Sequence, residues 1–231
     1  MKIRKLKLYH FPATRSARVF WALHEATDGA FEVEPLNLYG GAQYRPDYLA
    51  LNPNHSVPLL EITWEDSCIQ TMIESAAMIA FLADAYPEAG LAPPPGASPE
   101  RADYLQMLHF GGTQLDMMLW QIRIHKDVIS TDEADPRVVS RYLAKFTNEG
   151  EPQLAARLNA HAFICGDAFT AADCIIGYDI GWARSYGLCR DAVFSAYLSR
   201  VSKRPAYRKA FADAKTFNPK PPESRGAKFP G

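Results

Sequence analysis

The fold is decided by the stretch Asn52-Pro53-Asn54-His55-Ser56-Val57-Pro58-Leu59-Leu60. Because a proline cannot donate a hydrogen bond to a sheet, Pro58 belongs at the start or the edge of a strand. The bond before a proline is also where a cis peptide costs least, about 0.5–1 kcal/mol above trans. A cis bond between Val57 and Pro58 would turn the backbone N–H and C=O of Val57 outward. The stretch therefore predicts an edge that pairs, in the manner of a strand, with an extended peptide.

A second feature follows at Met72-Ile73-Glu74-Ser75-Ala76-Ala77, where Glu74 and Ser75 begin an alanine-rich helix. The start of a helix presents free N–H groups and the positive end of the helix dipole, which suits a carboxylate. Each pattern also has a simpler interpretation. The first would be only a loop that closes onto a strand, and the second only an acid that caps a helix. Their order and spacing after the N-terminal segment favour a joint binding site.

The first 86 residues alternate between strand and helix patterns. The helix between the first two strands makes them parallel, and Trp64-Glu65-Asp66 joins the last two as an antiparallel hairpin. Pro35 places the second strand at an edge. We therefore expect an α/β domain at 1–86 with a mixed four-stranded sheet. The expected strands are 5–10, 31–38, 57–62 and 67–73, and the expected helices are 17–27 and 74–86.

Residues 87–99 hold five prolines and two glycines, which is typical of a stiff, polar linker. The patterns after it are helical and predict an all-α domain at 100–215. Thr170-Ala171-Ala172-Asp173 has the form of a capping box, with Asp in place of Glu, before a buried helix. The other expected helices are 101–125, 136–147, 152–161, 192–202 and 206–214. Residues 216–231 hold prolines without periodicity, and we expect an extended tail there.

Composition limits the class of protein. The net charge of −1 argues against nucleic acid or an anionic membrane as the main partner. The four cysteines lack CxxC or zinc-site spacing, so we expect no metal. Three of them sit in apolar or small-residue runs and are expected to be buried free thiols in a reducing compartment. The N-terminus lacks the apolar core of a signal peptide, and no apolar run is long enough to span a membrane. A cytoplasmic protein is the expectation.

Taken in order, these motifs resemble a cytosolic glutathione transferase of the bacterial type from residue 5 to about residue 215. The N-terminal pattern is similar to the thioredoxin-like domain of that family, and Val57-Pro58 is similar to its cis-proline motif. Glu74-Ser75 resembles its acidic-serine motif, and Thr170 to Asp173 resembles the capping motif of its helical domain.

The resemblance implies glutathione as the co-substrate and assigns residues to it. Val57, beside Pro58, would pair with the cysteinyl backbone, and Ser75 with the start of its helix would hold the γ-glutamyl carboxylate. Glu74 would take the γ-glutamyl ammonium group, unless it only stabilises the helix dipole. Ser56 stands where many members carry lysine or glutamine, so the candidates for the contact to the glycyl carboxylate are His55, Gln43 and Arg45.

The chemistry of the family needs a thiolate, and a hydrogen bond to the charged sulfur lowers the pKa of the thiol. Thr14 is the first candidate for this donor because it lies four residues before Arg18-Val19, the spacing of the serine-type classes. Ser16 is the second, although it is also placed to cap the helix, and His10 is the third. The turn contains no cysteine, which disfavours the disulfide-forming classes.

The family's second-substrate pocket lies between its two domains, and its expected residues here are Phe11, Met107, Gly111 and Met118, although the methionines also suit a core. The expected activity is conjugation of glutathione to a small hydrophobic electrophile, a detoxification reaction, or glutathione-dependent reduction at the same site. The alternatives are a non-catalytic glutathione-binding or regulatory module and a structural domain with an empty cleft. A homodimer is also implied.

Overall fold

The computed structural model describes residues 1–216 of the 231-residue chain, so the tail expected at 216–231 lies, apart from Thr216, outside the described residues. The chain forms two compact units. Unit 1 holds Met1–Arg101 and the last helix, α10 (Pro205–Thr216); unit 2 holds Ala102–Val201. The expected domain boundaries at 86 and 99 stay predictions.

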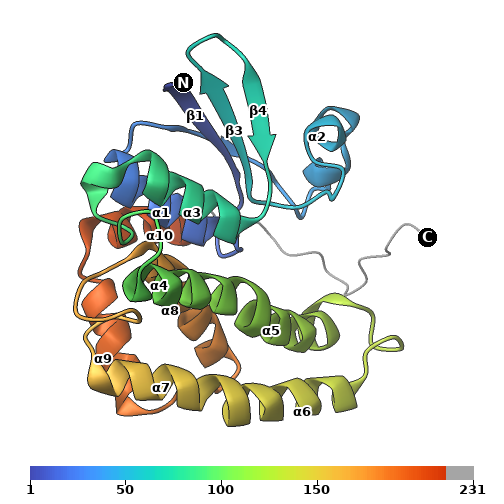
Figure 1. Ribbon diagram of the computed structural model, residues 1–231. Helices are drawn as coiled ribbons and strands as arrows, with labels where there is room; N and C mark the ends of the chain where they lie inside the picture. Colours follow the sequence, from blue (N-terminus) through green and yellow to red (C-terminus); the bar gives the residue numbers. More distant parts are fainter. Residues whose placement is uncertain (217–231) are drawn as a thin grey trace. The chain divides into compact units, whose positions relative to one another are not determined.

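The sheet of unit 1 confirms the predicted mixed four-stranded architecture. Its strand order is β2-β1-β3-β4, with β1 parallel to β2 and antiparallel to β3, and β3 antiparallel to β4. Figure 1 shows β1, β3 and β4 side by side. The strands are β1 (Ile3–His10), β2 (Glu32–Pro35), β3 (Leu59–Trp64) and β4 (Ile69–Met72).

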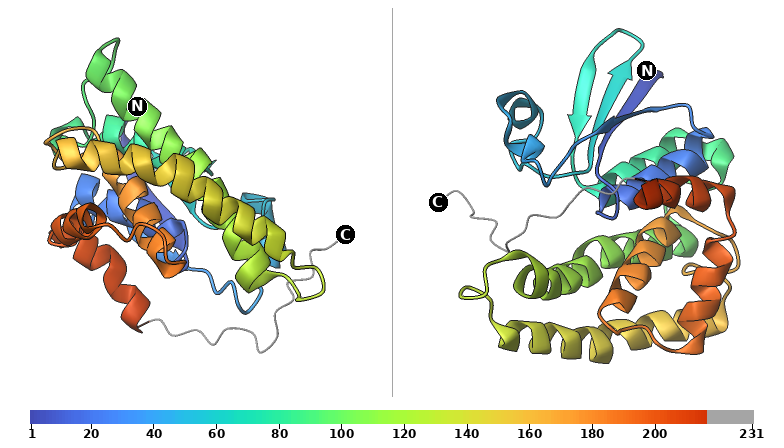
Figure 2. Two further views of the ribbon diagram at one scale, coloured as in Figure 1. Left: turned by 90° about the horizontal axis from the view of Figure 1, so that it is seen from below. Right: turned by 180° about the vertical axis from the view of Figure 1, so that it is seen from behind.

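Alternate residues of the central strands form the core of this unit. Leu6 and Leu8 of β1 and Leu60 and Ile62 of β3 are each at most 1% exposed, as expected for one face of a pleated sheet under helices. Helices α1 and α3 pack against each other on one face, and α2 lies on the other (Figures 1 and 2). The helical segments before residue 90 are α1 (Ser16–Thr27), η1 (Ala42–Tyr44), α2 (Pro46–Leu51), α3 (Ser75–Ala85) and η2 (Pro87–Ala89).

Helix α10 belongs to unit 1, although its position in the sequence led us to expect it in the helical domain. Trp21 of α1 lies edge-to-face against Tyr207 and Phe211 of α10, with ring centroids 4.9 and 6.1 Å apart. Arg204, just before α10, donates through Nε and Nη2 to the two carboxylate oxygens of Glu25 at 2.6 and 2.8 Å. These contacts between residues far apart in the sequence hold the end of the chain against α1.

Unit 2 is helical, as expected. The long helix predicted from residue 101 begins at Pro99 and runs through the π-helical segments η3 and η4. The helix predicted from Pro152 to about His161 is present as α7, which begins one residue earlier and follows α6 without a break through the π-helical η5. We attribute this continuity to η5, whose altered hydrogen-bond spacing accommodates a proline at the second residue of α7. The segments are α4 (Pro99–His109), η3 (Phe110–Leu115), α5 (Asp116–Arg123), η4 (Ile124–Val128), α6 (Pro136–Lys145), η5 (Phe146–Gly150), α7 (Glu151–Ala160), α8 (Ala171–Ser185) and α9 (Ala192–Val201).

The predicted capping box at the start of α8 is present. One carboxylate oxygen of Asp173 accepts from the backbone N–H of Thr170 at 2.9 Å, and the other accepts from the N–H of Ile164 at 3.0 Å and the hydroxyl of Tyr197 at 2.8 Å. Burial raises the pKa of Asp173 to about 6, and these donors oppose the rise. Asp173 therefore joins the start of α8 to the preceding loop and to α9.

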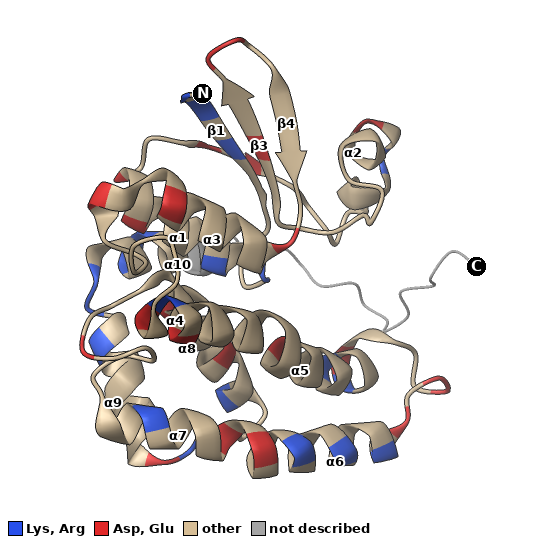
Figure 3. Ribbon diagram, viewed as in Figure 1, with Lys and Arg blue, Asp and Glu red and all other residues tan. Residues whose placement is uncertain are grey.

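Charged side chains of both signs are interspersed over the helices of both units (Figure 3). Within residues 1–216, no helix is both long enough and apolar enough to cross a membrane.

Candidate functional site at one edge of the sheet

The strand register brings three separate segments of unit 1 to one edge of the sheet. Tyr9, near the end of β1, pairs with Leu59 at the start of β3, and Leu60 pairs with Met72 at the end of β4. The turn after β1, the Val57-Pro58 segment before β3 and the Glu74-Ser75 segment after β4 therefore meet at this edge. This is the grouping that the sequence predicted for a peptide-binding site.

The Val57–Pro58 bond is cis, and the loop before it is fixed by side chains. The carbonyl of Ser56 accepts from the hydroxyl of Tyr48 at 2.6 Å and from the side-chain amide of Asn52 at 2.8 Å. Burial raises the pKa of Tyr48 to about 12, so its phenol stays protonated and donates at neutral pH. Among the described residues, the backbone of Val57 has no hydrogen-bond partner. Its N–H and C=O are therefore unpaired within this part of the chain.

Glu74 and Ser75 occupy the start of α3 in an unusual backbone conformation. Glu74 is the N-cap residue and has φ 69° and ψ 101°, a region that costs a residue with a side chain of order 1–3 kcal/mol. Residues held in such conformations cluster at ligand sites. The Glu74 side chain is exposed and makes no cap hydrogen bond, whereas Ser75 is only 6% exposed. The strain agrees with a binding role for this segment.

Arg18 joins α1 to this site, and sequence reasoning missed its role. Its guanidinium donates to the hydroxyl oxygen of Ser75 from Nε at 2.9 Å and from Nη2 at 2.6 Å, and Arg18 is only 2% exposed. A guanidinium has no acceptor, so both lone pairs of the Ser75 hydroxyl are used and its hydrogen must point elsewhere. A signal was available in the spacing of the sequence. Arg18 lies one helical turn before Trp21 and Ala22, which are buried, so it shares the inward face of α1.

The turn between β1 and α1 holds the three candidate thiolate donors. Thr14 is half-buried, and its hydroxyl donates to the carbonyl of Phe11 at 2.7 Å. Ser16 is fully buried and does not cap α1 as predicted, because its hydroxyl bonds back to Phe11 and to Nδ1 of His10. His10 is 3% exposed. Of the three, Thr14 is the most exposed residue.

His55 adopts a left-handed conformation with φ 43°, and its ring lies 5.1 Å from that of Tyr44. Phe11 is 4% exposed and packs with Tyr48 and Val57 in the core beside the site. Their assigned roles toward glutathione and a second substrate stay predictions.

In unit 2, Met107 of α4 and Met118 of α5 are each 2% exposed, as core residues are. Gly111 faces α8, where a Cβ atom would come 2.7 Å from Ile175 and 2.8 Å from Ile176. Close helix packing therefore accounts for this glycine, and the role of the three residues in a second-substrate pocket stays a prediction.

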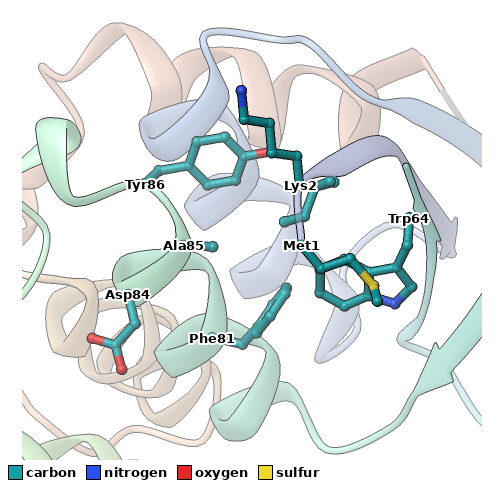
Figure 4. Close-up of a pocket in the computed structure, with 8 residues that line it drawn as sticks. Met1, Lys2, Trp64, Phe81, Asp84, Ala85 and Tyr86 are labelled. Carbon is teal, nitrogen blue, oxygen red and sulfur yellow. The ribbon is translucent and has the colours of Figure 1, made fainter. Parts of the chain in front are cut away.

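Unit 1 also has a pocket of about 550 Å³ at the opposite end of the sheet, where β1 begins and β3 ends. Figure 4 shows Trp64, Phe81 and Tyr86 around it, and the rings of Trp64 and Phe81 lie edge-to-face at 6.2 Å. None of the residues predicted to bind glutathione lines this pocket, so it is separate from the candidate site.

Comparisons with known proteins agree with this geometry. A family model described as "Glutathione S-transferase, N-terminal domain" matches residues 4–84. A zeta-class glutathione S-transferase from Euphorbia esula is 31% identical over 175 residues, which cover 73% of this chain and 72% of that protein. A probable glutathione S-transferase from Coccidioides immitis is 27% identical over 221 residues, covering 91% of this chain and 94% of that protein.

Among solved structures, the crystal structure of a glutathione transferase from Methylococcus capsulatus has a TM-score of 0.72 to this chain and is 27% identical. The match covers 92% of this chain and all of that one. The sheet-edge geometry, the family model and the relatives agree, and the chain belongs to the glutathione transferase family.

Proposed function

We propose that unit 1 binds glutathione at the edge of its sheet and that the protein conjugates the glutathione thiolate to a small hydrophobic electrophile. The observation that carries this proposal is the meeting of Val57, Glu74 and Ser75 at one edge, with the buried Arg18 bonded to the Ser75 hydroxyl. Family membership supports it.

Glutathione offers groups that fit this edge. The cysteinyl backbone pairs with the unpartnered N–H and C=O of Val57. The γ-glutamyl carboxylate accepts from the hydroxyl of Ser75 and from the N–H groups at the start of α3, where the helix dipole favours a negative charge. Glu74, exposed beside Ser75, takes the γ-glutamyl ammonium group. His55 is the candidate for the glycyl carboxylate.

Thr14 is the proposed thiolate donor, because it is half-buried whereas Ser16 is fully buried. A donor to the charged sulfur lowers the pKa of the thiol, whose unperturbed value is about 8.5. The thiol loses its proton to solvent, and the thiolate attacks the electrophilic carbon. A carbon–sulfur bond forms as the leaving group departs with its electron pair.

Titration calorimetry with glutathione tests the binding site. We expect Ser75→Ala to weaken binding about 10- to 100-fold, since a hydrogen bond to a charged group contributes about 1.5–3 kcal/mol. Ser67→Ala is the matched control, because Ser67 also accepts from an arginine, Arg4, but lies in the exposed hairpin turn. Equal affinity of wild type and Ser75→Ala, or no binding by wild type, would refute the assignment.

One observation favours a second candidate function, in which the protein binds glutathione but does not convert its thiol to a thiolate. The hydroxyl of Thr14 donates inward to the carbonyl of Phe11 at 2.7 Å, so in this arrangement its proton is not offered to a ligand. A binding or regulatory module needs no thiolate, whereas conjugation and glutathione-dependent reduction at the same site both need one.

A cytoplasmic location and a homodimer accompany the main proposal as expectations from the family.

A further inference from the structure

Two side chains at the end of α2 hold the loop that leads into the cis bond. Asn52 follows Tyr48 by one helical turn, and its backbone N–H donates to the carbonyl of Tyr48 at 2.8 Å, so the two side chains are neighbours. The Tyr48 hydroxyl and the Asn52 amide both donate to the carbonyl of Ser56, at 2.6 and 2.8 Å. Both residues are buried, so neither donor has ready access to water.

These two donors give the Ser56 carbonyl one stable direction. A carbonyl oxygen has two lone pairs, and both are used here. If the carbonyl turned away, a buried phenol and a buried amide would lose their acceptor, which is costly in a protein interior. The Asn52 side chain is itself fixed, because its oxygen accepts from the backbone N–H of Asn54 at 3.0 Å.

The direction of the Ser56 carbonyl sets the direction of the Val57 N–H. The two groups belong to one planar trans peptide unit, since the cis bond of this loop is the next one, Val57–Pro58. In a trans unit the C=O and the N–H point in opposite directions. With the carbonyl turned toward Tyr48 and Asn52, the Val57 N–H points away from both, and it has no partner among the described residues.

We propose that Tyr48 and Asn52 are positioning residues for glutathione, which fix the Ser56–Val57 peptide plane so that the Val57 N–H is aimed at the cysteinyl carbonyl before the ligand arrives. Neither side chain touches glutathione. A donor that is already fixed spares the complex the cost of ordering it on binding. The inference rests on the proposed function, in which Val57 pairs with the cysteinyl backbone.

The chain offers a matched pair of hydroxyl deletions. Tyr48→Phe keeps a buried ring and removes one donor to the Ser56 carbonyl. Tyr9→Phe is the control, because the Tyr9 ring lies 5.6 Å from that of Tyr48 but its hydroxyl donates to the carboxylate of Glu61 at 3.4 Å. Asn52→Asp removes the other donor and keeps a side-chain oxygen as an acceptor within the loop.

Two ligands separate positioning from a general effect on the fold. Glutathione carries the cysteinyl carbonyl, whereas γ-glutamylmethylamide ends before it and keeps the γ-glutamyl group that the proposed function places at Ser75. For Tyr48→Phe we expect the Kd for glutathione to rise about three-fold or more, and for Asn52→Asp about ten-fold or more, because the carbonyl loses donors. For Tyr48→Phe the Kd for γ-glutamylmethylamide should stay within about two-fold of wild type, since that ligand does not use the Val57 N–H.

Tyr9→Phe should match wild type with both ligands. An equal loss of affinity for the two ligands in Tyr48→Phe would indicate a general structural role and overturn the inference. An unchanged Kd for glutathione in Tyr48→Phe would overturn it as well, while leaving the proposed function intact. Failure of the wild-type protein to bind glutathione would instead refute the proposed function.

Nuclear magnetic resonance of wild-type protein with nitrogen-15-labelled valine gives a test that needs no variant. We expect the amide proton resonance of Val57 to move downfield when glutathione binds, because the N–H gains a hydrogen bond, and to move little with γ-glutamylmethylamide. A Val57 resonance that glutathione leaves in place would contradict the inference even where glutathione binds.

Discussion

At the residue scale, Asp173 caps α8 and also accepts hydrogen bonds from two other segments of unit 2. Its two carboxylate oxygens accept from Ile164, Thr170 and Tyr197, which belong to the loop before α8, the cap of α8 and α9. Each donor is buried, so removing the carboxylate leaves polar groups without a partner in the protein interior.

We expect Asp173→Ala to lower the free energy of unfolding by about 2–4 kcal/mol, because the cap is lost and buried donors stay unsatisfied. Asp167→Ala is the control, since Asp167 also accepts a backbone N–H in this loop, from Ala162, but its side chain is 83% exposed. We expect a change within about 0.5 kcal/mol for the control. Urea unfolding of both variants measures the difference, and equal losses would show that the buried contacts of Asp173 contribute little.

Residues at the site differ in how far the sequence could predict them. Pro58, Glu74 and Ser75 carry local signals, a proline at a strand start and an acid and a serine at a helix start. The contact between Arg18 and Ser75 joins residues 57 positions apart, and only the fold brings them together. The bond between His10 and Ser16 likewise depends on the path of the turn, which has no periodic pattern.

At the element scale, two glycines in unit 2 have opposite reasons for being glycine. Gly111 in η3 lies so close to α8 that a Cβ atom would meet the side chains of Ile175 and Ile176 below 3 Å. Gly181 in α8 is exposed, and a Cβ atom there would meet nothing within 4 Å. One glycine therefore allows helices to approach, whereas the other only weakens its own helix.

We expect Gly111→Ala to destabilise the protein by about 1–3 kcal/mol, because the added methyl group overpacks the contact with α8. Gly181→Ala should stabilise it by up to about 1 kcal/mol, the difference in helix propensity between glycine and alanine. Thermal and urea unfolding of the two variants provide the comparison. A stabilising Gly111→Ala would mean that η3 and α8 have room to separate.

The helices and strands differ in how far local sequence signals could predict them. Strand and helix order in unit 1 and the cap of α8 could be predicted, since periodicity and capping residues determine them locally. The continuity of α6 and α7 could not, because Pro152 is a signal for the start of a new helix, and the sequence does not show that the π-helical η5 joins α6 to that start.

At the scale of the whole molecule, the order of the sequence and the grouping in space differ at the C-terminus. Helix α10 follows the helices of unit 2 in the chain but packs on α1 of unit 1, through Trp21 and the pair of Glu25 and Arg204. The sequence places aromatic residues in both helices, but nothing local in α10 indicates its partner. Unit 1 is therefore completed only when the end of the chain returns to it.

The central claim for the molecule is that the edge of the sheet in unit 1 binds glutathione as a thiolate held by Thr14. The most direct test is the ultraviolet difference spectrum of the protein with glutathione at pH 6.5, recorded for wild type and for Thr14→Val. We predict a thiolate band in wild type that disappears in Thr14→Val while binding is retained, because a free thiol with a pKa near 8.5 is almost fully protonated at that pH. Binding by wild type without a thiolate band, or no binding at all, would contradict the claim.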